Sequence, residues 1–434
     1  MLVALLMWSS AYGVWQLVRP RERARTQDRD APRPSASRYR WFQSRWAGAG
    51  WLVLGLLGLT AASNSVGWQT EGAAFWSDGG VPALEARLRS DIVGWARQHR
   101  PVGLAVGIVA DDGVARATLG RSRLLPGGPP LREALFEIGS ITKTFTGILL
   151  AHMVEEGVVH LDRRVADSLP PGIELPVEVG AITLEQLATH TAGLPRQPPG
   201  MLSVGGFVRA VVGMDPYRGY TADELSGALD STSLTGARGE RSVYSNFGFA
   251  LLGWILGREA GVGYRRAIRD LVLAPLDVDG IEAEAGETAA RRAAGYRVAA
   301  GIGPLRFGLR AQSWEMTEAF GGAGGLRSTL DGMLGYLAAN MKRRATPLAA
   351  AVELSQQERF RTSPDRGMGL GWVRSRREDI GQTVIWHNGG TFGFSSFLGF
   401  TADGRFGVVA LSNTSVRVDD LALRLLAMIA DDGA

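Results

Sequence analysis

The feature that most restricts the fold is a set of strand-like runs. They lie near the beginning and near the end of the long segment that follows the first 66 residues. The runs are 102–111, 113–124, 383–390, 394–401 and 405–413. The first two flank Asp112-Gly113, a typical hairpin dipeptide, and the last two are joined across 402–404. We therefore predict an α+β fold. One antiparallel sheet is built from both chain ends and flanked by helices, and a mostly helical lobe lies between about residues 158 and 350.

Three segments have the apolar spacing of helices. Residues 82–100 precede the first strand, and residues 421–431 follow the last one. A third helix is expected around Ser140, with a buried stripe that includes Phe145 and with Gly157 where a C-cap glycine belongs.

Composition excludes several kinds of site. The chain has 434 residues, 45% apolar and 21% charged, which is ordinary for one large globular domain or two smaller ones. It has no cysteine, so a disulfide scaffold, a thiol nucleophile and a thiolate metal site are excluded. Its five histidines lack metal-ligand spacing such as HExxH, and we expect no metal and no cofactor.

The positive charge of the chain is concentrated in one segment. Residues 1–66 hold nine Arg and three acidic residues, a net of +6, whereas the remaining 38 basic and 40 acidic residues give −2. A nucleic-acid partner requires a basic face on the folded domain, and we expect none here.

The same N-terminal segment, 1–66, is predicted to target the chain to a membrane. An Arg- and Pro-rich stretch, 19–46, separates two apolar stretches, 1–18 and 47–63, as expected of a cytoplasmic loop between two spanning helices. Alternatively, the second apolar stretch belongs to a signal peptide with a cleavage site at Ala61-Ala62-Ser63.

Both interpretations export the rest of the chain. Residues 67–80 are predicted to be a linker and residues 81–434 the globular domain. The strong preference for Arg over Lys indicates a GC-rich, bacterial genome. We therefore expect a membrane-anchored protein whose domain is periplasmic or extracellular.

The chain has 45 arginines but only two lysines, and one of these, Lys143, stands three residues after Ser140. At helical spacing the two side chains share a face. A Ser hydroxyl becomes nucleophilic when a nearby base takes its proton, and a Lys with a lowered pKa can be that base whereas Arg cannot. Although an SxxK spacing arises often by chance, the avoidance of Lys elsewhere gives this one weight.

Tyr244 and Asn246 form a second pattern. Residues two apart face one site on an extended segment but not on a helix, so both can reach one site only if the apolar helix 247–256 begins after them. The alternative is an ordinary aromatic followed by an N-cap Asn.

His387 precedes Asn388 and the pair Gly389-Gly390 in the strand-like run 383–390. Strand alternation puts His387 and Gly389 on one face, and the glycines let a substrate backbone approach closely. A purely structural His is the alternative.

In this order, SxxK, YxN and HxG resemble the motifs of the penicillin-recognising serine hydrolases. The likeness is greatest to the class C β-lactamase-like branch, which also holds D-Ala-D-Ala carboxypeptidases, D-aminopeptidases and esterases. LATHTAGLPRQ, 187–197, looks like the loop that ends in a substrate-contacting Gln, here Gln197. GGAGGLRSTLDGM, 321–333, looks like a recurrent segment before a helix, for which we expect Ser328 or Thr329 as the N-cap. The resemblance covers about residues 82–430 and implies a β-lactamase/transpeptidase-like fold.

The resemblance also implies roles for individual residues. Ser140 would be the acylated nucleophile, Lys143 its base, and Tyr244 the group that relays protons to the leaving group and the deacylating water. The substrate would be held by Asn246 and Gln197 at its amide, and by His387 and Gly389 on the strand. The backbone N–H groups of Ser140 and Gly390 would form the oxyanion hole.

His387 stands where β-lactamases of this branch usually have Lys facing the substrate carboxylate. A neutral His removes a permanent charge, which favours a peptidase or esterase over a dedicated β-lactamase. The implied function is a serine hydrolase acting on β-lactams, D-Ala peptides or small esters. The alternatives are a penicillin-binding receptor acylated without turnover and an inactive interaction module. The absence of GxSxG excludes an α/β-hydrolase.

Overall fold

The computed structural model describes residues 73–78, 82–111, 113–124, 126–173, 175–201, 214–283, 289–302 and 305–432. The predictions for residues 1–66 lie outside these ranges. Within the described ranges, no helix combines the length and the apolar character needed to cross a membrane.

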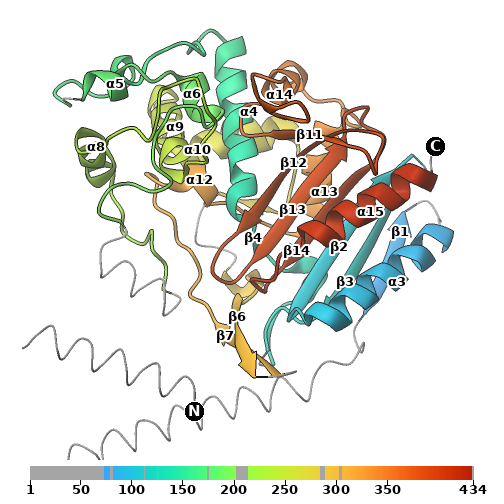
Figure 1. Cartoon of the computed structure of the whole chain (residues 1–434). Coiled ribbons are helices and arrows are strands. Elements are labelled where there is room, and N and C mark those ends of the chain that lie inside the picture. The colour runs from blue at the N-terminus through green and yellow to red at the C-terminus, as the bar shows by residue number, and fades with distance from the viewer. Residues whose placement is uncertain are drawn as a thin grey trace, which may run out of the picture. The chain divides into compact units, whose positions relative to one another are not determined.

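A nine-stranded antiparallel sheet organises the described part of the chain, in the order β1-β3-β2-β14-β13-β12-β11-β10-β9 (Figure 1). Its strands are β1 (Ala74–Asp78), β2 (Gly103–Ala110), β3 (Gly113–Gly120), β9 (Phe360–Ser363), β10 (Arg366–Met368), β11 (Val373–Arg377), β12 (Gln382–Gly390), β13 (Ser395–Thr401) and β14 (Gly407–Ser412). The predicted α+β fold with a sheet from both chain ends is confirmed. The two ends meet where β14 pairs with β2, with Val408 opposite Ile108.

Two edges of the sheet differ from the prediction. Residues 74–78 lie within the predicted linker, 67–80, but form β1, which pairs with β3. At the opposite edge, β9, β10 and β11 were not predicted. These edge strands are short and partly exposed, so their sequences lack the apolar alternation of a buried strand.

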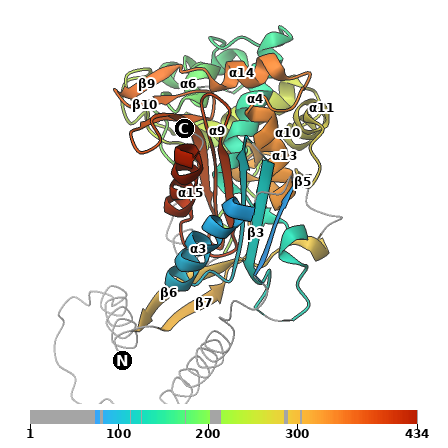
Figure 2. The same ribbon diagram turned by 90° about the vertical axis from the view of Figure 1, so that its right-hand side faces the viewer.

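One face of the sheet is covered by the two predicted terminal helices, α3 (Pro82–His99) and α15 (Asp419–Asp432), as Figures 1 and 2 show. Their buried side chains, such as Ile92 and Leu425, pack with Leu104 and Val106 of β2. The alternate β2 residue Ala105 belongs to the core on the other face. Strand β2 is thus buried on both faces, which explains its continuous apolar sequence.

The other face carries α13 (Leu330–Asn340), α4 (Thr142–Glu155) and the helical lobe. The helices of the lobe are α5 (Val177–Gly180), α6 (Leu184–Ala188), α8 (Ala222–Asp230), α9 (Asn246–Glu259), α10 (Tyr264–Ile268), α11 (Ala274–Leu276), α12 (Gly321–Gly324) and α14 (Ala349–Gln356). Helix α4 lies between sheet and lobe, so it is buried on nearly every side rather than along one stripe.

Helix ends follow their sequence signals. Gly157 follows α4 with φ +69°, and the N–H groups of Gly157 and Val158 bond back to Val154 and Met153, which closes the helix as predicted. Of the two expected N-caps of α13, Thr329 has the role, because its hydroxyl accepts a hydrogen bond from the Gly332 N–H.

The smaller strands lie outside the main sheet. Strands β4 (Phe136–Glu137), β8 (Arg327–Ser328) and β5 (Ile281–Glu282) form a three-stranded sheet, and β6 (Tyr296–Ile302) pairs with β7 (Leu305–Arg310). Strand β4 leads into the turn that holds Ser140.

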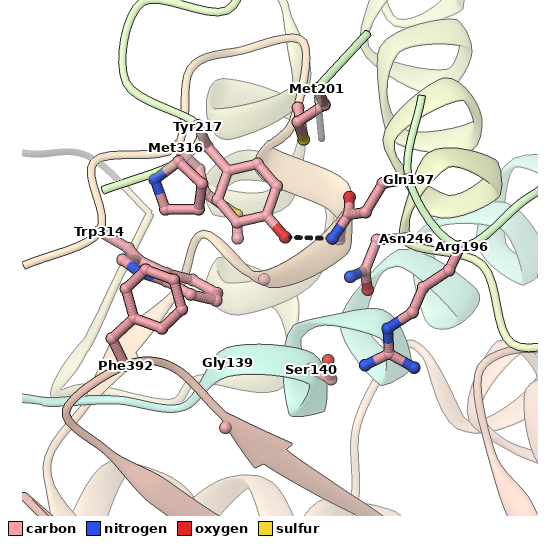
Figure 3. Close-up of a pocket in the computed structure, with 14 residues that line it drawn as sticks. Gly139, Ser140, Arg196, Gln197, Met201, Tyr217, Asn246, Trp314, Met316 and Phe392 are labelled. Atoms are coloured by element: carbon pink, nitrogen blue, oxygen red, sulfur yellow. Dashed lines mark hydrogen bonds between the residues drawn. The ribbon is translucent and has the colours of Figure 1, made fainter. Parts of the chain in front are cut away.

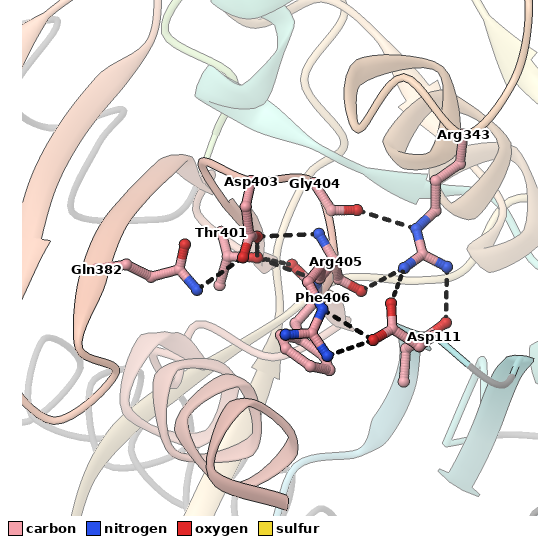
Figure 4. A network of polar contacts seen from close by, with 9 residues as sticks. Asp111, Arg343, Gln382, Thr401, Asp403, Gly404, Arg405 and Phe406 are labelled. Atoms are coloured by element: carbon pink, nitrogen blue, oxygen red, sulfur yellow. Dashed lines mark hydrogen bonds and ion pairs between the residues drawn. The ribbon is translucent and has the colours of Figure 1, made fainter. Parts of the chain in front are cut away.

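A polar network fixes the β13–β14 turn (Figure 4). Within the turn, Asp403 accepts hydrogen bonds from the Thr401 hydroxyl and the Arg405 N–H, and Gly404 has φ +75°. The Arg405 side chain donates to Asp111, just after β2, and Arg343, just after α13, donates to the same carboxylate. These guanidinium groups lower the pKa of Asp111, with Arg405 contributing most. The network joins segments from both chain ends.

Candidate active site

Ser140 lies in a single 3-10 turn, η2 (Gly139–Ile141), between β4 and α4. Gly139 enters this turn with φ +50°, a conformation that favours glycine. Gly389 at the end of β12 and Gly139 in the turn let the strand lie against the turn. A Cβ atom at Gly389 would lie 2.0 Å from the carbonyl oxygen of Ile138, and one at Gly139 would lie 2.8 Å from the Gly390 nitrogen. The turn that holds Ser140 and strand β12 are therefore in direct backbone contact.

Lys143 is completely buried one turn after Ser140. Its Nζ donates hydrogen bonds to Ser140 Oγ at 3.0 Å, Asn246 Oδ1 at 3.0 Å and the carbonyl oxygen of Ala323 at 2.6 Å. Burial, and to a lesser extent the nearby Arg196, lower the pKa of Lys143 well below its usual value. No carboxylate contacts this ammonium within the described ranges. Lys143 is thus placed and tuned to accept a proton from Ser140.

Tyr244 donates a hydrogen bond from its hydroxyl to Ser140 Oγ at 2.6 Å. Burial raises the pKa of Tyr244 to about 12, so the phenol is neutral near pH 7. His190 packs against its ring, with centroids 4.5 Å apart, and Lys143 Nζ lies 4.9 Å from the ring centroid.

Helix α9 begins at Asn246 rather than after it, and Ser245 rather than Asn246 is its N-cap. The Ser245 hydroxyl accepts a hydrogen bond from the Gly248 N–H. Tyr244 therefore lies on the extended segment before the helix, and Asn246 lies on its first residue. Both reach the Ser140–Lys143 pair, as the YxN pattern requires.

His387 lies on β12 and is buried, with 3% of its surface exposed. Its Nδ1 is 2.6 Å from the carbonyl oxygen of Asn388. The pKa of His387 falls to about 3, mainly because the ring is buried and secondly because Lys143 lies nearby. The ring is therefore neutral near pH 7 and adds no positive charge to the site. The role expected for it, facing a substrate carboxylate, stays a prediction.

A cavity of about 270 Å³ opens beside Ser140 (Figure 3). Of the residues predicted from the sequence, Ser140, Gln197, Asn246 and Gly390 line it. Those predicted residues that do not line it are Lys143, Tyr244, His387 and Gly389. Gln197 donates from Nε2 to the Tyr217 hydroxyl at 2.7 Å, and its buried Oε1 has no partner. This oxygen is suited to accept a hydrogen bond from a substrate amide.

The sequence patterns did not identify the aromatic wall of the cavity, which is formed by Tyr217, Trp314 and Phe392. Trp314 stacks edge-on against both other rings. Its backbone N–H donates to buried Glu137 on β4, at 3.0 Å. This contact ties the wall to the strand that leads into the Ser140 turn. Isolated aromatics in loops have no periodic signal, so only the folded chain brings them together.

Arg196 was also missed, although it stands next to Gln197 in the segment 187–197. Its backbone carbonyl accepts hydrogen bonds from the N–H groups of Asn246 and Phe247. Its guanidinium lies 4.9 Å from the centre of the Tyr244 ring. The adjacency to Gln197 was the available signal.

Comparisons with known proteins agree with this geometry. The profile of the beta-lactamase family matches residues 83–431. D-alanyl-D-alanine-carboxypeptidase/endopeptidase AmpH of Escherichia coli K12 is 27% identical over 372 residues, which cover 79% of this chain and 91% of that protein. A beta-lactamase of Lysobacter lactamgenus is 24% identical, and the match covers 78% of this chain and 89% of that protein.

Two solved structures share the fold. The beta-lactamase/D-alanine carboxypeptidase from Pseudomonas syringae has a TM-score of 0.67 at 19% identity and covers 81% of this chain and 99% of its own. The octameric penicillin-binding protein homologue from Pyrococcus abyssi has a TM-score of 0.67 at 24% identity. The match covers 80% of this chain and 77% of that chain. The resemblance read from the three motifs is confirmed: this chain belongs to the beta-lactamase family of serine hydrolases.

Proposed function

We propose that this protein is an exported, membrane-tethered hydrolase that cleaves amide or ester bonds through an acyl-enzyme at Ser140. Its substrates would be β-lactams, D-Ala peptides or small esters. The observation that carries the proposal is that Ser140 Oγ accepts hydrogen bonds from both Lys143 and Tyr244 beside an open cavity. A nucleophile held between a base and a proton donor is the arrangement that acyl transfer requires.

Acylation begins with proton transfer from Ser140 to Lys143. The lowered pKa of Lys143 favours the neutral amine. The two N–H groups of that amine can serve Asn246 Oδ1 and the Ala323 carbonyl, while its lone pair faces Ser140 Oγ. Oγ then attacks the substrate carbonyl carbon, and the developing oxyanion is stabilised by the N–H groups of Ser140 and Gly390.

The leaving group departs when the tetrahedral intermediate collapses and the carbonyl–nitrogen or carbonyl–oxygen bond breaks. Tyr244 donates its hydroxyl proton to the leaving group and is reprotonated from Lys143, as its hydrogen bond to Ser140 and its raised pKa support. A water molecule then attacks the acyl-enzyme. Its proton returns through the same groups, and Ser140 is restored.

Substrate orientation follows from the polar groups around the cavity. The unpartnered Gln197 Oε1 and the Asn246 amide would hold the substrate's amide group, and the aromatic wall would hold its acyl side chain. The relatives named as carboxypeptidase and as beta-lactamase support both peptide and β-lactam substrates. Export and tethering rest on the apolar and Arg-rich composition of residues 1–66.

Labelling with a fluorescent penicillin tests the proposal, with Ser140→Ala as the matched control. We expect covalent labelling of wild type and none of the variant, and repeated turnover of a chromogenic β-lactam or ester after an initial burst. Acylation without turnover would instead indicate a receptor. If no β-lactam, ester or D-Ala peptide acylates Ser140, the proposed chemistry is wrong. Fractionation of cells that express the full chain tests export separately.

A further inference from the structure

The cavity beside Ser140 carries its charge at one place. Among the described residues that line it, Arg196 alone has an ionisable side chain that is charged at neutral pH. His387 supplies no charge because its pKa is about 3. Figure 3 shows the Arg196 guanidinium reaching toward Ser140 on the side of Asn246, with Trp314 and Phe392 on the opposite side. The cavity therefore has a cationic side and an aromatic side.

The Arg196 backbone is fixed, but its side chain is not used by the fold. The two hydrogen bonds from the start of α9 hold its carbonyl. Its guanidinium has no carboxylate partner within the described ranges and lies over the Tyr244 ring, 4.9 Å from the centroid. The guanidinium lies over an aromatic ring and also lines the cavity, where its N–H groups can make paired hydrogen bonds to a carboxylate.

We propose that Arg196 binds a carboxylate on the leaving-group side of the scissile bond and makes the enzyme selective for substrates that end in a free carboxylate. This proposal rests on the proposed function. The side follows from Tyr244, which contacts Arg196 and hydrogen-bonds Ser140, and which in the proposed mechanism donates the proton to the leaving group. A C-terminal amino acid, a hydroxy acid and the acid-bearing ring of a β-lactam all meet this requirement.

A second effect of Arg196 has to be separated from binding. Its charge also lowers the pKa of Lys143, and this effect acts on every substrate alike. The ratio of kcat/KM values for two substrates with the same scissile bond cancels it. The substrates are N-acetyl-D-alanyl-D-lactate and N-acetyl-D-alanyl-D-lactamide, which share one ester bond and differ in a carboxylate against a neutral carboxamide.

We expect wild type to prefer the lactate, and Arg196→Gln to lower the lactate-to-lactamide ratio by about 10- to 100-fold, the size of a charge-assisted hydrogen bond. Arg196→Lys should fall between them because it keeps the charge but loses the paired donors. The control is Arg218→Gln, which removes the same charge from an exposed residue next to cavity-lining Tyr217. Its ratio should equal that of wild type.

An unchanged lactate-to-lactamide ratio in Arg196→Gln would overturn the proposal. If kcat/KM fell equally for both substrates, Arg196 would act through Tyr244 or Lys143 and not by binding the carboxylate. If Arg196→Gln does not fold, Arg196→Met, which keeps an apolar stem, replaces it.

Binding without chemistry separates this proposal from the proposed function. In Ser140→Ala protein, calorimetry with the same two compounds should show tighter binding of the lactate, lost on adding Arg196→Gln. If wild type cleaves neither compound but Ser140→Ala still prefers the lactate, the proposed hydrolysis of these esters fails and the carboxylate site stands. Equal affinities would remove the carboxylate site even if wild type cleaves both.

Discussion

Gly139 packs so closely against Gly390 that a Cβ atom on Gly139 would lie 2.8 Å from the Gly390 amide nitrogen. The nitrogen expected to stabilise the oxyanion thus touches the turn that holds Ser140. Gly139→Ala should push the turn and β12 apart. Because a displacement of about 1 Å at reacting atoms costs roughly 100-fold in rate, we expect kcat/KM to fall by at least about 100-fold, measured with a chromogenic ester.

Gly157→Ala is the matched control for that substitution. Gly157 also has a positive φ, +69°, but a Cβ atom there meets nothing within 4 Å. It should lose about 1 kcal/mol of stability through backbone strain and keep its activity. If Gly139→Ala is as active as Gly157→Ala, the contact between Gly139 and Gly390 does not control the rate.

The two lysines of the chain permit a second matched comparison. Lys143→Arg keeps a positive charge but cannot release a proton, so the rate of acylation should fall by about 100- to 10,000-fold, the usual contribution of a general base. Lys342→Arg changes an exposed residue paired with Glu353 at 2.9 Å and should acylate like wild type. Mass spectrometry of the acyl-enzyme measures both rates. An active Lys143→Arg protein would exclude Lys143 as the base.

Arg196 should also set the pH at which the enzyme becomes active. Its charge lowers the pKa of Lys143, so Arg196→Gln raises that pKa, and a higher pH is then needed to obtain the neutral amine. The acid limb of the kcat/KM profile should therefore move to higher pH, measured with the uncharged lactamide so that carboxylate binding does not contribute. A limb that stays in place or moves to lower pH would contradict this prediction.

His387 should make the folded protein sensitive to acid. Burial holds its folded pKa at about 3, below the value of 6.5 expected for an unfolded chain. Between these values the unfolded chain binds the proton more tightly, so stability rises with pH and is lost as pH falls. From about pH 6.5 to 4.5, this residue should cost wild type about 2 kcal/mol of unfolding free energy.

His387→Asn should lose correspondingly less stability over the same pH interval in urea titrations. The carboxylates common to both proteins cancel in the comparison. Parallel losses in the two proteins would mean that the His387 ring accepts its proton without cost to the fold.

The sheet could be predicted because its central strands are buried and their sequences show it. β2, β13 and β14 are apolar runs bounded by turn residues, and each was placed correctly. β1 and β9 to β11 were missed because an edge strand is stabilised by its neighbour's backbone and needs few apolar side chains. The sequence of β11, VRSRR, resembles a loop, and the segment forms a strand because it pairs with β12.

The site could be predicted as far as its motifs reach. Ser140, Lys143 and Tyr244 come together as the SxxK and YxN motifs indicated, since each motif is a local pattern with a chemical reason. Arg196 and Trp314 follow no such pattern. In a chain with 45 arginines, an exposed Arg is distinguished only when a loop places it at the cavity.

The pairing of β2 with β14 has a consequence for synthesis of the protein. The Ser412 hydroxyl donates to the carbonyl of Gly103 across a separation of 309 positions. A ribosome must therefore make almost the whole domain before the central strand pair can close, and a loop of that length closes slowly. Until then β2 has an open, apolar edge that can pair with other chains. Closure of the sheet thus comes after synthesis of its last strand, which is compatible with the export proposed for this chain.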